Sequence, residues 1–236
     1  MPSGVSVRLE DVRRSFDGGL VQSLRGVSLD VEAGDSVALM GPTGCGKSTL
    51  LSMVGLLDVP DSGVVLLDGR PAEEWEPTED FRASRIGFVF QHHHLLPHLT
   101  IAENVELPLA GRAGRSRRRT LAQEALHRVG LEPRAGTRAA FVSGGERQLA
   151  AVARALVGTP GLLLADEPTG SVDSETGERI LSLLRDWRST TSGTLILVTH
   201  DSSVAAGCRR LVRMRDGRIE EGRPVRLFVA ATSSPS

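Results

Sequence analysis

The residues with the clearest chemical role lie in the stretch MGPTGCGKSTLL, residues 40–51. This stretch fits the pattern G-x-x-x-x-G-K-[ST]. In such a loop, successive backbone N–H groups curl around a phosphate, the lysine reaches the β- and γ-phosphates, and the serine hydroxyl ligates Mg²⁺. We therefore expect a nucleotide and Mg²⁺ site to which the loop contributes Gly41, Pro42, Thr43, Gly44, Cys45, Gly46, Lys47, Ser48 and Thr49.

Lys47 is the only lysine in a chain whose lysines and arginines together number 28. Arginine carries a larger, planar guanidinium, whereas lysine carries a compact ammonium, so a lysine kept at this one place indicates a steric demand. An apolar β-like run precedes the loop and helical apolar spacing follows it. A helix N-terminus therefore follows a strand and a loop, which is the arrangement of an anion site. We also expect the thiol of Cys45 to be open to alkylation unless a nucleotide covers it.

Two acidic residues follow the apolar run LLLA, so a strand that is expected to be buried ends in Asp166 and Glu167. Burial of an unpaired carboxylate is costly, which indicates that a cation binds at this strand end. Beside a phosphate loop that cation is Mg²⁺. We expect Asp166 to hold the metal, directly or through water, and Glu167 to accept a proton from the attacking water.

The segment VSGGERQ predicts a helix that begins with a capping box, because Glu146 follows Ser143 by three residues. Gly144 and Gly145 lie in the first turn, where each weakens a helix by about 1 kcal/mol relative to alanine. These glycines leave the backbone N–H groups bare. The segment therefore predicts a second anion-binding helix terminus.

Three further residues follow expected strands. His200 ends the run LILVT, where it is either structural or a hydrogen-bond partner of a γ-phosphate. Gln91 ends RIGFVFQ, and its neutral amide can orient a water or ligate the metal. Phe16 precedes a glycine-containing turn, where it either packs in the core or stacks on a base.

Composition narrows the class of protein. The 236 residues suit one large domain or a core with an inserted subdomain. The net charge of −1 does not favour nucleic acid as a general partner. No run approaches the roughly 18 apolar residues of a membrane span, and the two cysteines lack metal-ligand spacing. We expect a cytosolic protein without a signal peptide or a disulfide framework.

The order of expected elements predicts an α/β fold. Alternating residues from 5 to 31 indicate antiparallel strands, and residues 62–69 and 85–91 indicate further strands. Helical spacing then replaces the β pattern, and an αβ rhythm returns with helices at 143–157 and 174–188. We expect one domain over 1–236, with a core at 1–91 and 158–225, a helical subdomain at about 92–157 and a frayed tail at about 226–236.

These motifs, in this order, resemble the ATP-binding subunit of ABC transporters over nearly the whole chain. The resemblance implies a P-loop NTPase core with a mixed central sheet, an N-terminal antiparallel β subdomain and an inserted helical subdomain. It also implies ATP hydrolysis between two copies. The implied roles are base stacking for Phe16, the Walker A loop for 41–49, the Q-loop for Gln91, the signature motif for 143–148, the Walker B acid for Asp166, the catalytic base for Glu167, the D-loop for 171–173 with Asp173, and the switch histidine for His200.

Residues 86–109 and 165–177 are most similar to the lipoprotein-release and macrolide-export (LolD/MacB-like) and FtsE-like branch. That branch implies ATP and Mg²⁺ as cofactors, a second copy or a homologous subunit, and FtsX/MacB-like transmembrane permease subunits as partners. It also implies a peripheral place at the cytoplasmic face of the inner membrane. The alternative is an FtsE-like regulatory ATPase that signals through a membrane partner without transport.

The chain departs from the family pattern at three positions: Val142 and Ser171 replace a usual leucine and asparagine, and Leu149 replaces a common arginine. The basic run at 111–120 is open to two interpretations, a solvated helix face or a contact with lipid headgroups.

Overall fold

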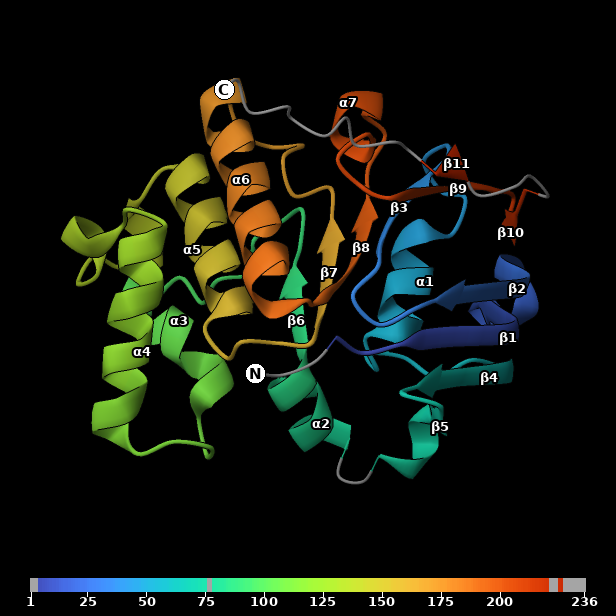
Figure 1. The fold of residues 1–236 in the computed structure, drawn as a ribbon, viewed down its shortest axis with the longest axis horizontal. Coiled ribbons are helices and arrows are strands. Elements are labelled where there is room, and N and C mark those ends of the chain that lie inside the picture. The colour runs from blue at the N-terminus through green and yellow to red at the C-terminus, as the bar shows by residue number, and fades with distance from the viewer. Residues whose placement is uncertain (1–3, 76–77, 221–224, 227–236) are drawn as a thin grey trace, which may run out of the picture.

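A mixed sheet forms the middle layer of the protein, whose computed structural model describes residues 4–75, 78–220 and 225–226 (Figure 1). Its strands follow the order β10-β9-β3-β8-β7-β6, and β11 also pairs with β9. Strands β3 and β6 to β9 run parallel to one another, whereas β10 and β11 pair antiparallel with β9. Their bounds are Ser36–Met40 for β3, Ile86–Val89 for β6, Leu162–Asp166 for β7, Thr194–Val198 for β8, Arg210–Arg215 for β9, Arg218–Ile219 for β10 and Val225–Arg226 for β11.

The central strands are apolar on both faces because both faces are covered. Along β7, Leu162 and Leu164 enter one hydrophobic core, whereas Leu163 and Ala165 enter the other. Strand β8 alternates in the same way. The sheet therefore separates two cores, and the expectation of a mixed central sheet is confirmed.

An antiparallel sheet covers one face of this layer, with the strand order β2-β1-β4-β5. It shares a hydrophobic core with α1 (Lys47–Val54) and the central strands. This confirms the expected N-terminal β subdomain. The strand bounds are Val7–Phe16 for β1, Val21–Val31 for β2, Ser62–Leu67 for β4 and Arg70–Pro71 for β5.

Helices cover the other face and extend to the left in Figure 1. The helices α3 (Ile101–Glu106), α4 (Arg115–Arg128) and α5 (Gly144–Leu156) pack on one another, and α5 also packs on α6 (Ser174–Thr191). The helix predicted at 174–188 therefore extends three residues further. A short helix, α7 (Ser202–Ala205), follows β8.

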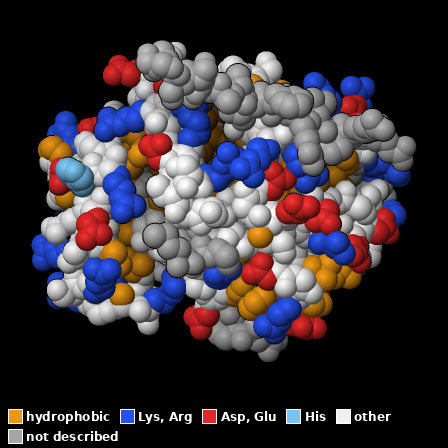
Figure 2. All heavy atoms as spheres, viewed as in Figure 1, with side chains coloured by type: hydrophobic (Ala, Val, Ile, Leu, Met, Phe, Trp, Pro, Cys, Tyr) orange, Lys and Arg blue, Asp and Glu red, His pale blue; other side chains and the backbone are white. Residues whose placement is uncertain are grey.

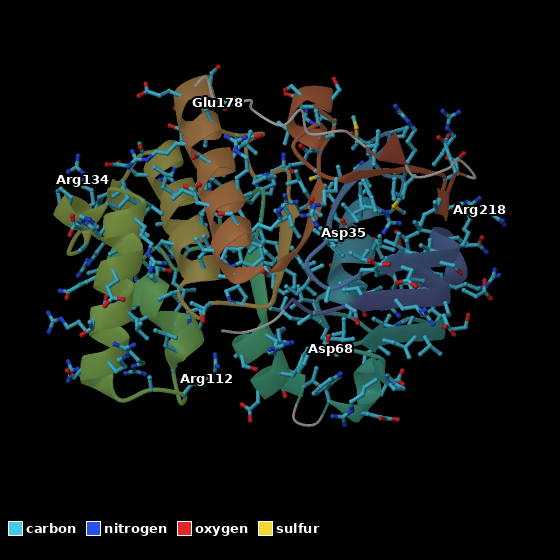
Figure 3. The ribbon with its side chains drawn as sticks, viewed as in Figure 1. Asp35, Asp68, Arg112, Arg134, Glu178 and Arg218 are labelled. Atoms are coloured by element: carbon cyan, nitrogen blue, oxygen red, sulfur yellow. The ribbon has the colours of Figure 1, made fainter. Side chains whose placement is uncertain are left out.

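Sequence patterns did not indicate α2 (Thr78–Arg85), which lies at the bottom of Figure 1. Its residues are mostly polar, and only Phe81 is buried in it. The ring of Trp75 lies 4.1 Å from that of Phe81, so a contact outside the helix anchors it. Arg112 points toward α2 in Figure 3, and its Nη1 donates to the carbonyl oxygen of Ala83 at 2.6 Å. The tail expected at 226–236 lies outside the described residues apart from Arg226.

Acidic and basic side chains intermingle over the face drawn in Figure 2. Several form ion pairs between neighbouring elements. Arg14 of β1, for example, lies 2.8 Å from carboxylate oxygens of both Asp58 and Asp61.

Leu164 tests the core between α1 and the central sheet, because its side chain is fully buried. We expect Leu164→Ala to lower the free energy of unfolding by about 3 kcal/mol, since truncation loses transfer free energy and leaves a cavity. Chemical denaturation followed by circular dichroism measures the change. Leu20→Ala is the matched control at an exposed leucine, with an expected effect within about 0.5 kcal/mol. Equal losses in the two variants would contradict the assigned core.

Candidate nucleotide-binding site

The phosphate loop connects β3 to α1 and closes around the ammonium group of Lys47. Lys47 is only 9% exposed, and its Nζ donates to the carbonyl oxygen of Gly41 at 2.8 Å and to that of Pro42 at 2.9 Å. The ammonium charge of Lys47 is thus held by carbonyl groups of the loop itself. A guanidinium is wider than an ammonium, so arginine would have less room at this position.

Two loop glycines lie where a side chain would not fit. A Cβ at Gly41 would overlap the carbonyl oxygen of Met214, and one at Gly46, where φ is +102°, would overlap that of Ser23. The helix α1 begins at Lys47, and its first N–H groups have no intrahelical acceptor. No other acceptor among the described residues takes the N–H groups of Lys47 and Ser48. This backbone cradle at a helix N-terminus fits a phosphate group.

The hydroxyl groups and the thiol of the loop point in different directions. Ser48 is exposed in the first turn of α1. The Oγ1 of Thr49 lies 2.7 Å from the Oγ of Ser23, a hydrogen bond that connects α1 to β2. Cys45 is buried and packs in the core beside α1, and its Sγ lies 3.8 Å from the Nζ of Lys47. The expectation of an accessible Cys45 thiol was therefore wrong, because the thiol points inward.

Glu167 and His200 meet at the carboxyl edge of the central sheet. Glu167 follows β7 and has a φ of +45°, an uncommon value for a residue with a side chain. Its backbone N–H donates to the carbonyl oxygen of Val198 at 2.9 Å, and its Oε1 lies 2.8 Å from the Nδ1 of His200. The side chain of Glu167 is 14% exposed and that of His200 is 74% exposed. The carboxylate is thus sheltered, whereas the imidazole faces outward.

The carboxylate of Glu167 raises the pKa of His200 above its usual value, first through the hydrogen bond and then through its charge. Asp201 adds a smaller contribution in the same direction, and Lys47 opposes it. Asp166, the last residue of β7, pairs in register with Val198 of β8. The structure therefore brings the two acids and the histidine to one edge.

Gln91 lies two residues after the end of β6 and is exposed. Its carbonyl oxygen accepts a hydrogen bond of 3.3 Å from the Oγ of Ser171. The serine that departs from the family pattern thus connects the D-loop segment to the Q-loop segment. Leu149, another departure, is buried in the core of the helical part.

The second expected helix terminus begins α5 and has both bonds of a capping box. The Oγ of Ser143 accepts from the N–H of Glu146 at 3.1 Å, and the Oε2 of Glu146 accepts from the N–H of Ser143 at 2.8 Å. The hydrogen bond from the backbone N–H of Ser143 is the largest cause that lowers the pKa of the Glu146 carboxyl, and Arg134 lowers it further through an ion pair of 2.9 Å. Arg134 lies at the outer edge of the helical part in Figure 3.

Gly144 has open space where a Cβ would lie, so its backbone is accessible from outside. Asp173 lies near Gly145 and caps α6, where it accepts from the N–H of Thr176 at 2.9 Å. Among the described residues, no hydrogen bond or ion pair joins the start of α5 to the phosphate loop. The structure therefore places the signature and D-loop residues together, as a group separate from the loop.

Phe16 lies at the end of β1 and is exposed, so its ring is not part of the core. The guanidinium of Arg14 lies 5.0 Å from the ring centroid. An exposed aromatic ring before the turn at 17–19 leaves a surface on which a planar base can stack.

Sequence reasoning did not single out Arg154, which holds the turn after Gln91. Its guanidinium donates to the carbonyl oxygens of His93 and His94, both at 2.6 Å. Both histidines have positive φ values, 40° and 49°, a strained conformation that the two bonds stabilise. The available signal was an arginine inside the apolar segment AVARAL, where an unpaired charge would be costly.

The fold and the phosphate loop define a P-loop protein that binds a nucleotide. The family model described as "ABC transporter" matches residues 24–170, so the chain belongs to the ABC transporter family. Within that family it is an ATP-binding cassette, and its relatives include LolD and MacB proteins.

Two relatives and one solved structure show the extent of the similarity. The macrolide export ATP-binding/permease protein MacB of Shigella flexneri is 41% identical over 97% of this chain, but over only 36% of its own length. The lipoprotein-releasing system ATP-binding protein LolD of Syntrophotalea carbinolica is 44% identical over 90% of this chain and 96% of its own. A dimeric ATP-binding cassette in a post-hydrolysis state with ADP and Pi matches with a TM-score of 0.86 and 38% identity, covering 94% of this chain and 98% of the other.

This chain therefore spans about a third of the MacB relatives that it matches. None of the helices in the described residues has the length and apolar character needed to cross a membrane.

Substitutions of Lys47 test whether the phosphate loop has room for an ammonium group but not for a guanidinium group. We expect Lys47→Ala to abolish ATP hydrolysis and Lys47→Arg to lower kcat at least about 10-fold, because the carbonyl cradle is sized for an ammonium. Phosphate release measures both. Near wild-type turnover of Lys47→Arg would contradict the steric argument, whereas equal thermal stability of the variants would exclude misfolding as the cause of a loss.

His200 tests the contact with Glu167. Its charged form is stabilised by the carboxylate, so the pair is fully formed below a pH of about 6.5 and is lost as pH rises through the raised pKa of His200. NMR titration of the ring should give a pKa above about 6.5 in the wild type and a lower pKa in Glu167→Gln. A resonance assigned with His200→Asn that titrates alike in both proteins would show that the pair does not form.

Proposed function

We propose that the protein is the ATP-hydrolysing subunit of a membrane transporter and that two copies close around two ATP molecules. The observation that carries this proposal is the separation of two anion-binding helix termini in one chain. The start of α1 serves a phosphate at the sheet edge, whereas the start of α5 makes no contact with that loop among the described residues. A facing copy supplies the second terminus, and a two-fold axis makes both sites complete.

Residues of one copy form the first side of the proposed site. Lys47 and the loop N–H groups bind the β- and γ-phosphates, and Phe16 stacks on the adenine. Glu167 accepts the proton of the attacking water, and His200 contacts the γ-phosphate. Mg²⁺ would be held by Ser48, Gln91 and Asp166 and would supply positive charge to the phosphate oxygens.

Residues of the second copy form the other side. Ser143, Gly144, Gly145 and Glu146 begin α5, whose N-terminus would face the γ-phosphate, and Asp173 would lie near the seam. In this arrangement residues 1–91 and 158–225 form the ATP-binding core, and residues of about 92–157 form the helical subdomain. The similar solved structure is a dimeric cassette bound to ADP and Pi, which supports a shared site.

The proposed membrane partner is a permease subunit of the FtsX/MacB-like kind. The name of the Shigella relative joins ATP binding to a permease, and this chain matches a part of that protein. A groove of about 430 Å³ lies beside the Q-loop segment, with Leu57, Phe88, Phe90, His94 and Pro160 among its lining residues. Glu79, Arg82 and Arg154 also line this groove, which offers a partly apolar seat for such a partner. The protein would then lie peripherally at the cytoplasmic face of the inner membrane.

Glu167→Gln tests the shared site. The variant keeps the shape of the side chain but cannot accept a proton, so we expect it to bind ATP without consuming it and to remain dimeric. Size-exclusion chromatography with light scattering should show a dimer with Mg-ATP and a monomer without nucleotide. The wild type under the same conditions is the control, because it hydrolyses ATP and reopens. A variant that binds ATP at saturation but stays monomeric would contradict the proposed dimer.

A further inference from the structure

Gln148 is a glutamine with no exposed surface, although it closes the motif whose first residues lie at the accessible start of α5. Its Nε2 donates to the carbonyl oxygen of Phe90 at 3.2 Å and to that of Pro168 at 2.9 Å. Phe90 precedes Gln91, and Pro168 follows Glu167. One amide group therefore connects α5 to the two segments that carry the proposed metal ligand and the proposed base.

The hydrogen bonds of Gln148 lie just beyond the last paired residues of β6 and β7. The pairing of β6 with β7 ends at Val89 and Ala165. Beyond that pair, the two chain segments need other contacts to keep a fixed separation. The amide of Gln148 supplies one such contact, and the bond from Ser171 to the carbonyl oxygen of Gln91 supplies another.

The oxygen atom of the same amide indicates that the NH₂ group makes the stabilising contacts. The Oε1 of Gln148 is buried and has no hydrogen-bond partner among the described residues. A buried acceptor without a partner is unfavourable, and an apolar side chain of the same length would avoid it. An exchange of the two amide atoms would set Oε1 against two carbonyl oxygens, so the observed orientation is the favourable one.

We propose that Gln148 is a positioning residue that holds Gln91 and Glu167 in register with each other and with α5. This inference rests on the proposed function, in which the start of α5 contacts the ATP of the facing copy. A shift of α5 on closure would then be passed through Gln148 to the base and the metal ligand of its own copy. Each site would thus be completed in response to the nucleotide at the other.

Gln148→Met is the primary test, because methionine matches the length of glutamine and removes both donors. Gln148 contacts no residue of the phosphate loop through these bonds, so nucleotide binding should persist. We expect kcat to fall about 10- to 30-fold, with KM for ATP within about threefold of the wild type and a Hill coefficient closer to one. Misplacement of reacting groups by about 1 Å is enough for a loss of this size.

Three other variants complete the experiment. Gln123→Met is the matched control at an exposed glutamine on α4, with wild-type kinetics expected. Gln148→Asn keeps the amide one methylene short and should recover part of the lost kcat. Ser171→Ala, at an exposed position, removes the hydrogen bond from Ser171 to the carbonyl oxygen of Gln91. This variant should lower kcat about two- to fivefold without a change in KM.

The outcomes separate this inference from the proposed function. Wild-type kcat in Gln148→Met would overturn the inference. A Gln148→Met protein that folds but loses both nucleotide binding and thermal stability would also overturn it. If Gln148→Met does not fold, unchanged kcat in both Gln148→Asn and Ser171→Ala overturns it instead. A wild-type protein that binds ATP but does not hydrolyse it would count against the proposed function itself.

Discussion

The register of the parallel strands is the constraint on which the site depends. Strand β8 lies between β3 and β7, and Val198 pairs with Leu39 on one side and with Asp166 on the other. The phosphate loop, the histidine and the two acids therefore emerge at one level of the sheet. A slip of one residue would turn each side chain to the opposite face and move Glu167 away from His200. The buried apolar residues that fix this register thus determine the geometry of the chemistry.

Much of the fold and the site could be predicted because their signals are local. The phosphate loop is defined within nine residues, and the capping box at Ser143 is defined within four, so each pattern implies its own backbone geometry. Continuous apolar runs indicated β7 and β8, which are buried on both faces. The residues at the ends of these runs were expected to share an edge, and the parallel pairing brings them there.

Other features depend on contacts that sequence spacing does not reveal. The bond between Glu167 and His200 joins residues 33 positions apart, and the amide of Gln148 reaches segments 58 and 20 positions away. The short polar helix α2 rests on a ring contact with Trp75 rather than on its own pattern. The direction of the Cys45 thiol depends on how the loop packs against the core. These features require a three-dimensional arrangement before they can be recognised.

The buried position of Lys47 has a consequence for covalent chemistry. It carries the single side-chain amine of the sequence, and every other basic side chain is an arginine or a histidine. Guanidinium groups do not undergo the acyl-transfer reactions that acetylate lysines or join them to other proteins, because they stay protonated. The arginine-rich exterior is therefore inert toward lysine-directed acylation, and the one side-chain amine that such reagents could modify is held by the carbonyls of the phosphate loop.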